Sequence, residues 1–473
     1  MNRWVSIQVK FLAVVAVFWS APILAEVRLP SILGDHMVVQ RDRPVSLWGW
    51  DDAGAGVTVT LGQASATATA DADGRWMVQL PAMAAGGPHT ITIEGTSTVT
   101  LKDVLVGEVW LCSGQSNMEW TVLRSANPAE EVAAANHPLI RHIKIGRAPT
   151  ETTQDDAPAG GWQVCSPETA GNFTAVGYYF ARHLNGELQV PIGLIGSNWG
   201  GTRIEPWTPP VGFQNVPALK EIAENLENLP AKTAEGRVNH QSPLALYNGM
   251  IHPLLPFAIR GAIWYQGESN NGEGMLYYEK MKALIHGWRS VWNDPEMPFY
   301  YVQLAPYRYK VDPERLPGIW EAQLKTLEVP HTGMAVTVDI GDVTDIHPLN
   351  KQDVGKRLAL WALAKTYGQS DLVHSGPLYR SLEIEGGRAI ISFDHVGGGL
   401  VSRDGQSLSH FQIAGDDGQF VEAQAEIVGQ TVVVSAESVP QPVAVRFGWH
   451  QEAEPNLSNR EGLPASPFRT DSW

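Results

Sequence analysis

The stretch VWLCSGQSNME, residues 109–119, combines a predicted buried strand with a polar turn and marks the start of the α/β pattern in the sequence. Its first four residues are apolar and typical of a short buried strand, and a polar turn follows directly (Ser113-Gly114-Gln115-Ser116). Glycine permits a sharp turn that exposes the serine after it. The second glycine of a Gly-x-Ser-x-Gly elbow is absent because Met118 stands in its place, which disfavours the α/β-hydrolase type of turn. Taken alone, the stretch is better explained as a polar turn than as a nucleophile loop.

Strand and helix patterns alternate after this stretch. Strand patterns occupy residues 192–197, 259–265, 298–304 and 333–339, and helical patterns occupy residues around 274–290 and 350–367. Apolar residues line one face of an earlier helix, namely Phe173, Val176, Phe180 and Leu184. A further helix is expected to start at Asn127-Pro128, with the asparagine as its cap. The alternation predicts an α/β fold, with a parallel sheet covered by helices on both faces.

Three folded domains are expected. Residues 26–105 show short alternating strand runs at 45–50, 57–61 and 90–93, the pattern of an N-terminal β-sandwich. Residues 106–375 are expected to form the α/β domain, and residues 376–473 a C-terminal β-rich domain with strand runs at 389–393 and 432–434.

Residues 1–25 have the pattern of a secretory signal peptide. Arg3 and Lys10 give a positive start, residues 11–24 are mostly apolar, and Ala25 supplies a small residue before the expected cut. A membrane anchor is the alternative, but the apolar run is shorter than the ~20 residues that a spanning helix needs. The sequence therefore predicts an exported protein, periplasmic or extracellular, without membrane insertion of the mature chain.

Composition narrows the classes of partner. The chain has 44% hydrophobic and 18% charged residues, which is ordinary for a globular protein, and a net charge of −16. Loss of Arg3 and Lys10 would lower it to −18, and an acidic surface argues against binding to nucleic acid or anionic membranes. Cys112 and Cys165 are compatible either with one disulfide or with two buried thiols. The sequence does not predict the oligomeric state.

Three more polar loops follow predicted strands. The run SNWGGTRIEPW, 197–207, contains Gly200, whose N–H is a candidate oxyanion donor, although a tight turn would explain it too. The run WYQGESN, 264–270, offers side-chain amides, or simply a polar helix cap. The run DIGDVTDIHP, 339–348, sets a histidine beside carboxylates, as in a general base with its orienting acid. A metal site is the competing interpretation of this run, but no second histidine lies at ligand spacing. Because all four loops leave the same edge of a parallel sheet, they predict one acyl-transfer site.

Together these stretches resemble the sialate O-acetylesterases and related carbohydrate acetylesterases of the SGNH-hydrolase superfamily. The matching runs are GEVWLCSGQSNM (107–118), NWGGT (198–202), YNGMI (247–251), IWYQGES (263–269), DIHP (345–348) and GLPASPFR (462–469). The resemblance implies a flavodoxin-like SGNH-hydrolase three-layer sandwich with flanking β-sandwich domains. It also implies a serine esterase that hydrolyses O-acetyl esters on carbohydrate without a metal or other cofactor.

By the same resemblance, Ser116 is the nucleophile, His347 the general base and Asp345 the acid. Asp342 is the second candidate for the acid, because many superfamily members place the acid three residues before the histidine, where this chain has Thr344.

The resemblance places the oxyanion hole at the backbone N–H groups of Ser116 and Gly200 plus a side-chain amide. The superfamily's asparagine falls on Ser269, so Gln266 is the first choice for the amide and Asn270 the second.

Candidate substrate contacts are Trp199, Arg203, Trp207 and Glu268, with Trp120 as a further aromatic surface for a sugar ring. Arg203 would pair with a sialate carboxylate or, equally well, with neighbouring Glu205. Acetylated xylan or xyloglucan is the alternative substrate, and a non-catalytic carbohydrate-binding protein is the alternative function.

Overall fold

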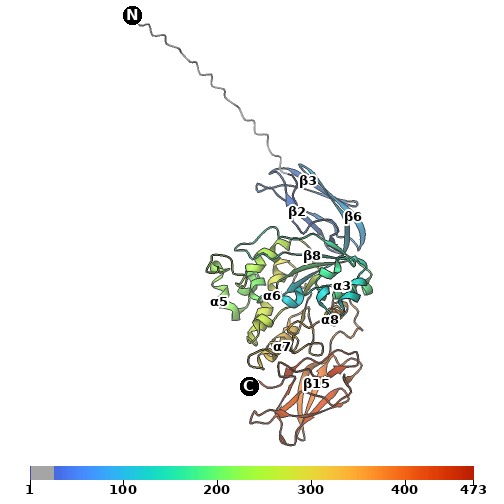
Figure 1. Ribbon diagram of the computed structural model, residues 1–473, viewed down its shortest axis with the longest axis vertical. Coiled ribbons are helices and arrows are strands. Elements are labelled where there is room, and N and C mark those ends of the chain that lie inside the picture. The colour runs from blue at the N-terminus through green and yellow to red at the C-terminus, as the bar shows by residue number, and fades with distance from the viewer. Residues whose placement is uncertain (2–25) are drawn as a thin grey trace.

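The structure, a computed structural model, describes Met1 and residues 26–473. The predicted signal peptide falls on residues 2–25 and so lies outside the described residues. Figure 1 shows a β-rich part nearest the N-terminus, an α/β part in the middle and a second β-rich part at the C-terminal end. This is the mixed α/β architecture with flanking β-sheets that the strand and helix patterns predict.

A sheet of strands crosses the middle part. The order across it is β13 (Thr332–Ala335), β12 (Phe299–Val302), β11 (Gly261–Tyr265), β7 (Thr98–Gly114), β10 (Ile192–Asn198), β8 (His137–Lys144) and β9 (Gln163–Cys165). All neighbours are parallel except β8 and β9. The four strands predicted after residue 190 are confirmed, within a few residues of their expected ends. Strands β7, β10, β11 and β13 all run in the same direction across the sheet. The loops that follow them therefore leave the same edge of the sheet.

Helices cover both faces of this sheet. On β7, Trp110 packs edge-on against Phe180 of α3 (Ala175–Leu188), with ring centroids 5.0 Å apart. On β11, Trp264 packs against Trp288 of α6 (Leu276–Val291), with centroids 5.9 Å apart. Trp264 is in register with Ser113, three residues beyond Trp110, so the two tryptophans point to opposite faces. Helix α8 (Lys351–Lys365) packs beside α3.

The shorter helices are α1 (Ser116–Glu119), α2 (Pro128–Ala133), α4 (Pro210–Gln214), α5 (Lys220–Ala223) and α7 (Arg315–Lys325). Helix α2 starts at Pro128 and Asn127 takes the N-cap position, both as predicted, but the asparagine side chain does not cap the helix. Asn127 adopts a left-handed backbone with φ of 51°, and its side chain makes no capping hydrogen bond. By contrast, Asn350 does cap α8, where its side chain accepts from the backbone N–H of Asp353 at 3.0 Å.

The N-terminal part shares a strand with the middle part. Its first sheet joins β1 (Val38–Gln40), β3 (Gly56–Leu61), β4 (Ala64–Thr69) and β6 (Gly86–Glu94) to the first half of β7, and β2 (Val45–Trp50) pairs with β5 (Arg75–Leu80). Strand β7 pairs with β6 and β1 up to Gly107 and with β10 and β11 from Glu108 to Gly114. The boundary predicted between residues 105 and 106 therefore falls inside one continuous strand.

The C-terminal part has its own apolar core, which includes Phe393, Phe411, Phe447 and Phe468. One sheet orders β14 (Leu378–Glu385), β15 (Arg388–Asp394), β20 (Thr431–Ser435) and β19 (Gln424–Val428). Another orders β18 (Val421–Glu422), β17 (Phe411–Ala414), β21 (Ala444–Phe447) and β23 (Phe468–Arg469), while β16 (Leu400–Ser402) pairs with β22 (Leu457–Asn459).

Cys112 and Cys165 are separate buried thiols, so the disulfide alternative is wrong. Within the described residues, no helix combines the length and the apolar character that a membrane crossing requires.

Candidate active site

Ser116 lies at the carboxyl end of β7, where a tight turn presents it to solvent. Gly114 has a φ of +134°, and a Cβ there would come within 2.2 Å of the carbonyl oxygen of Tyr265, so the turn requires glycine. The N–H of Gln115 donates to that same carbonyl at 3.0 Å, which anchors the turn to β11. Ser116 then opens α1, so its own N–H has no carbonyl partner within the helix.

His347 reaches Ser116 from the loop between β13 and α8. The Nε2 atom of His347 lies 2.9 Å from the Oγ of Ser116, a hydrogen-bonding distance between residues 231 positions apart in sequence. Burial lowers the pKa of the imidazole below 6.5, and Lys351 and Arg124 lower it further, while the nearby Asp345 opposes them. The ring is therefore mostly neutral at pH 7 and able to accept the serine proton.

Of the two predicted acids, Asp345 lies beside the imidazole. Its Oδ1 is 3.7 Å from Nδ1 of His347 and accepts the backbone N–H of the same residue at 2.8 Å. Asp342 instead closes a local turn, in which its Oδ1 accepts from the N–H (2.8 Å) and hydroxyl (2.6 Å) of Thr344. The Asp345 side chain is 48% exposed, so its hold on the ring is loose.

Trp120 supports the histidine from the nucleophile side. Its ring stacks on His347, with centroids 4.4 Å apart and planes 14° from parallel. The guanidinium of Arg124 lies 3.5 Å from the centroid of the Trp120 ring, and the indole N–H donates to the Arg124 carbonyl at 2.6 Å. Since His347 and Arg124 both contact this ring, the parts of Trp120 that they cover are not available to a sugar ring.

Gly200 is next to Ser116, as predicted, but its N–H already has an acceptor. It donates to Oε2 of Glu119 at 2.9 Å. A Cβ on Gly200 would lie 3.2 Å from the Cβ of Ser116, so a larger residue would crowd the nucleophile. The Nη2 of Arg147 holds both Glu119 oxygens at 2.8 Å. Sequence reasoning missed Glu119, although it lies one helical turn after Ser116, where a side chain on the same face is expected.

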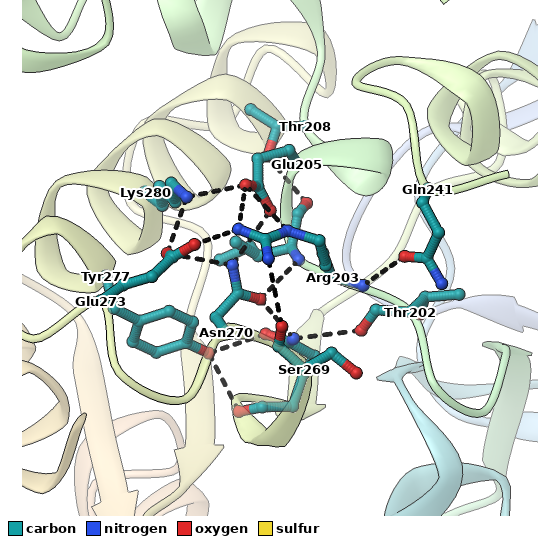
Figure 2. Close-up of polar contacts among 12 residues, drawn as sticks. Thr202, Arg203, Glu205, Thr208, Gln241, Ser269, Asn270, Glu273, Tyr277 and Lys280 are labelled. Atoms are coloured by element: carbon teal, nitrogen blue, oxygen red, sulfur yellow. Dashed lines mark hydrogen bonds and ion pairs between the residues drawn. The ribbon is translucent and has the colours of Figure 1, made fainter. Parts of the chain in front are cut away.

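The two amides predicted as oxyanion donors, those of Gln266 and Asn270, belong instead to a buried network, in which Figure 2 labels Asn270. The Asn270 amide donates to Glu205 and Glu273, each at 3.1 Å. The Gln266 amide donates to the carbonyl of Thr202 at 3.1 Å and to Oδ1 of Asn270 at 2.8 Å. Both predictions are corrected, because the hydrogen bonds that the two amides donate lie within this network and do not point toward Ser116.

The predicted substrate contacts separate into surface and interior residues. Trp199 is half-buried and stacks on His240, with centroids 4.7 Å apart. Trp207 is 0% exposed and its indole donates to Thr202, so the structure excludes it as a sugar platform. Glu268 turns inward, where its Oε1 accepts from Asn117 at 2.6 Å, and so it is corrected from a substrate contact to an internal group.

Arg203 is held by the same network as Asn270 (Figure 2). Its guanidinium pairs with Glu205 at 3.0 Å and with Glu273, and it donates to the Ser269 carbonyl at 3.3 Å. The local pair with Glu205 is therefore the alternative that the structure bears out. Throughout the described part of the chain, no group of three or more His, Cys, Asp or Glu residues is arranged to hold a metal ion.

This chain matches a known protein family and several known proteins. The sequence profile of the family described as "Carbohydrate esterase, sialic acid-specific acetylesterase" matches residues 106–363. Human sialate O-acetylesterase is 32% identical over 433 residues, covering 83% of this chain and 81% of its own length. The rat sialate O-acetylesterase is 34% identical over 421 residues, covering 76% of this chain and 77% of its own.

Among solved structures, a carbohydrate acetylesterase from Xanthomonas citri superposes with a TM-score of 0.87 at 42% identity, covering 95% of this chain and 100% of that one. The fold and these relatives define a carboxylic ester hydrolase. Within that class, the chain belongs to the sialic acid-specific acetylesterase family of carbohydrate esterases.

Proposed function

We propose that this protein is a serine esterase that removes O-acetyl groups from carbohydrate, with Ser116 as nucleophile, His347 as base and Asp345 as its orienting acid. The observation that carries the proposal is the 2.9 Å contact between the Ser116 hydroxyl and Nε2 of His347. A serine within hydrogen-bonding reach of a neutral imidazole is an activated nucleophile. The family match supports acetylated carbohydrate as the substrate class.

The reaction would proceed in two halves. As the Ser116 oxygen attacks the acetyl carbonyl carbon, His347 takes the hydroxyl proton, and it returns that proton to the sugar oxygen when the C–O ester bond breaks. Water then attacks the acetyl-enzyme, with His347 again as base, and acetate leaves as the serine recovers its proton.

The backbone N–H groups of Ser116 and Gly200 would stabilise the oxyanion of both tetrahedral intermediates. Losing one such donor raises the barrier by roughly 3–4 kcal/mol. Because Glu119 accepts the Gly200 N–H in the resting structure, its carboxylate must withdraw before that donor can serve.

We also propose that the catalytic part has the SGNH-hydrolase three-layer sandwich. Five parallel strands, β7, β10, β11, β12 and β13 in chain order, lie across the sheet in the order 2-1-3-4-5, and β8 adds a further parallel strand beside β10. This is the flavodoxin-like order, with a ligand site expected beyond the carboxyl ends of the strands. Ser116, Gly200 and His347 all follow such ends.

The sugar itself has two candidates. The family description and the curated relatives favour an acetylated sialic acid. One observation favours a neutral glycan such as acetylated xylan or xyloglucan: Arg203 is already paired with two carboxylates, and the chain carries a net charge of −16. Comparing kcat/KM for acetate release from both substrate types separates the candidates, and a preference for the neutral glycan would exclude the sialate assignment.

The decisive test of the chemistry is labelling with a fluorophosphonate, which reacts with activated serines. The wild-type protein should be labelled, and Ser116→Ala should not. An unlabelled wild type, or equal labelling of Ser116→Ala, would leave a non-catalytic carbohydrate-binding protein as the better explanation.

Export to a periplasm or to the medium is part of the same proposal. It rests on the charge and apolar pattern of residues 1–25. The amino-terminal sequence of the exported protein should begin at Glu26, and retention of Met1 in the mature protein would contradict it.

A further inference from the structure

A buried asparagine beside the nucleophile joins three loops of the site. Asn117 is 1% exposed, and its Nδ2 donates to the carbonyl of Ile346 at 3.0 Å and to Oε1 of Glu268 at 2.6 Å. Its Oδ1 accepts from Nζ of Lys351 at 2.6 Å. Ile346 directly precedes His347, so a single amide ties the backbone of the base to the helix that carries the nucleophile.

The two ionisable partners of Asn117 are an unusual choice for a protein interior. Lys351 is 0% exposed, at the first position of α8, and Oε2 of Glu268 is buried without a hydrogen-bond partner within the described residues. Burial lowers the pKa of Lys351 to about 7 and raises the pKa of Glu268. Burying such groups is costly, and proteins tolerate that cost chiefly where function requires it.

The pair fixes which way the Asn117 amide points. A lysine offers only donors, so it must face Oδ1, and a carboxylate oxygen is an acceptor that faces Nδ2. If the amide turned over, both contacts would become repulsive. The orientation that remains is the one in which Nδ2 reaches the Ile346 carbonyl.

This anchor matters because Asp345 holds the histidine only loosely. The 3.7 Å between Oδ1 of Asp345 and Nδ1 of His347 exceeds a normal hydrogen bond, and the carboxylate is half-exposed. From the structure we infer that Asn117 is a positioning residue that fixes the backbone of His347 relative to Ser116, and that Lys351 and Glu268 lock its amide in the required orientation. This inference rests on the proposed function of Ser116 and His347.

Kinetics on p-nitrophenyl acetate, a small acetyl ester, test the inference across pH. Asn117→Ala should lower kcat by about 10- to 100-fold with KM within threefold, since displacing a catalytic group by ~1 Å costs about 100-fold. Asn117→Asp should lose as much, because an ionised carboxylate cannot donate to the Ile346 carbonyl. Asn456→Ala is the matched control: in the C-terminal part, this buried side chain contacts three acceptors through Nδ2 and two donors of Ser409 through Oδ1, so its loss should affect stability and not kcat.

The pH profile separates positioning from mere packing. The charged groups that act on His347 are Asp345, Lys351 and Arg124, and those that act on Lys351 are Glu268 and Asp345. Lys351→Met removes a positive charge that lowers the His347 pKa, so the acidic limb of kcat/KM should move to higher pH. Asn117→Ala changes no charge. The acidic limb of its kcat/KM profile should therefore stay at the same pH while kcat falls.

Glu268 supplies a conservative pair of variants. Glu268→Gln keeps an oxygen acceptor for the Asn117 amide and should retain more activity than Glu268→Leu, which removes it. If Asn117→Ala does not fold, this pair and the pH limb of Lys351→Met decide the question.

Fluorophosphonate labelling distinguishes the two levels of failure. An unlabelled wild type rejects the proposed function. If the wild type is labelled and Asn117→Ala has the same kcat per folded molecule, only the positioning role of Asn117 is rejected. The role of Lys351 and Glu268 would be rejected by two results together. The acidic limb of kcat/KM would be unshifted in Lys351→Met, and Glu268→Gln and Glu268→Leu would be equally active.

Discussion

The backbone N–H of Gly200 donates to the carboxylate of Glu119 at 2.9 Å, three residues after the nucleophile. Hydrogen bonds to a charged acceptor are among the stronger ones in proteins, typically about 1.5–3 kcal/mol. An oxyanion forming on the acetyl group would need the same donor and would be repelled by the same carboxylate. In the proposed reaction, the Glu119 carboxylate must therefore move away from the Gly200 N–H before that donor can bind the oxyanion.

Removing that carboxylate should free the donor. Glu119→Ala is expected to raise the rate of acetyl-ester hydrolysis about 3- to 10-fold, or up to about 1.4 kcal/mol off the barrier. Stopped-flow acylation with p-nitrophenyl acetate measures it directly. Glu130→Ala, which removes an exposed carboxylate on α2, is the control. A tenfold drop in Glu119→Ala would instead mean that the carboxylate assists the reaction.

The two candidate acids can be told apart by isosteric changes. Asp345→Asn should lower kcat by less than the about 10⁴-fold seen for a buried triad acid, because Asp345 is half-exposed and 3.7 Å from the ring. Asp342→Asn should leave kcat within twofold, since its carboxylate serves only the Thr344 turn. Equal losses in both variants, measured under saturating substrate, would contradict this assignment.

The pH dependence should follow the His347 pKa. The base acts when neutral, so activity falls as the pH drops through its pKa, and burial places that midpoint below 6.5. Arg124→Gln removes a positive charge that lowers the pKa, so the acidic limb of kcat/KM should move upward. Asp345→Asn removes the opposing negative charge, so its limb should move downward. Shifts in the reverse directions, read from kcat/KM between pH 4 and 8, would exclude His347 as the titrating base.

The contact between α3 and α8 depends on a glycine. A Cβ on Gly355 would come within 2.6 Å of the Tyr179 Cβ and 2.7 Å of the Phe180 nitrogen. Gly355→Ala should therefore lower the free energy of unfolding by about 1–3 kcal/mol. Gly186→Ala is the matched control, because its Cβ would enter open space on α3 and should stabilise the helix by up to about 1 kcal/mol. Urea unfolding followed by tryptophan fluorescence compares them, and equal midpoints would refute the packing argument.

Local pattern was enough to predict the strands and the loops that carry Ser116, Gly200 and His347. These follow from apolar runs, glycine turns and the geometry of a parallel sheet, all of which act over a few residues. The wrong predictions concern side chains whose partners are distant in sequence. Gln266 and Asn270 look like free amides until Thr202, Glu205 and Glu273 are brought beside them by the fold.

The inward orientation of two side chains, Lys351 and Trp207, gave no usable signal in the sequence. A lysine at the start of a helix is typically exposed, so the sequence gives no sign that Lys351 is buried. The structure shows it buried, with its Nζ donating to Asn117. Trp207 is predicted to contact a sugar because it lies in the loop that contains Gly200, yet its indole is buried in the core. Sequence spacing does not encode which face of a loop points inward.

Strand β7 connects the amino-terminal β-sheet directly to the loop that carries Ser116. Residues 98–107 pair within the β-sandwich, and the same strand continues without a turn to Gly114, two residues before Ser116. No protease-sensitive linker is expected between these parts, and no hinge about which they could rotate. For evolution this is a limit on modularity: the hydrolytic unit cannot be exchanged between proteins by recombination at its amino-terminal boundary without severing the strand that presents its own nucleophile.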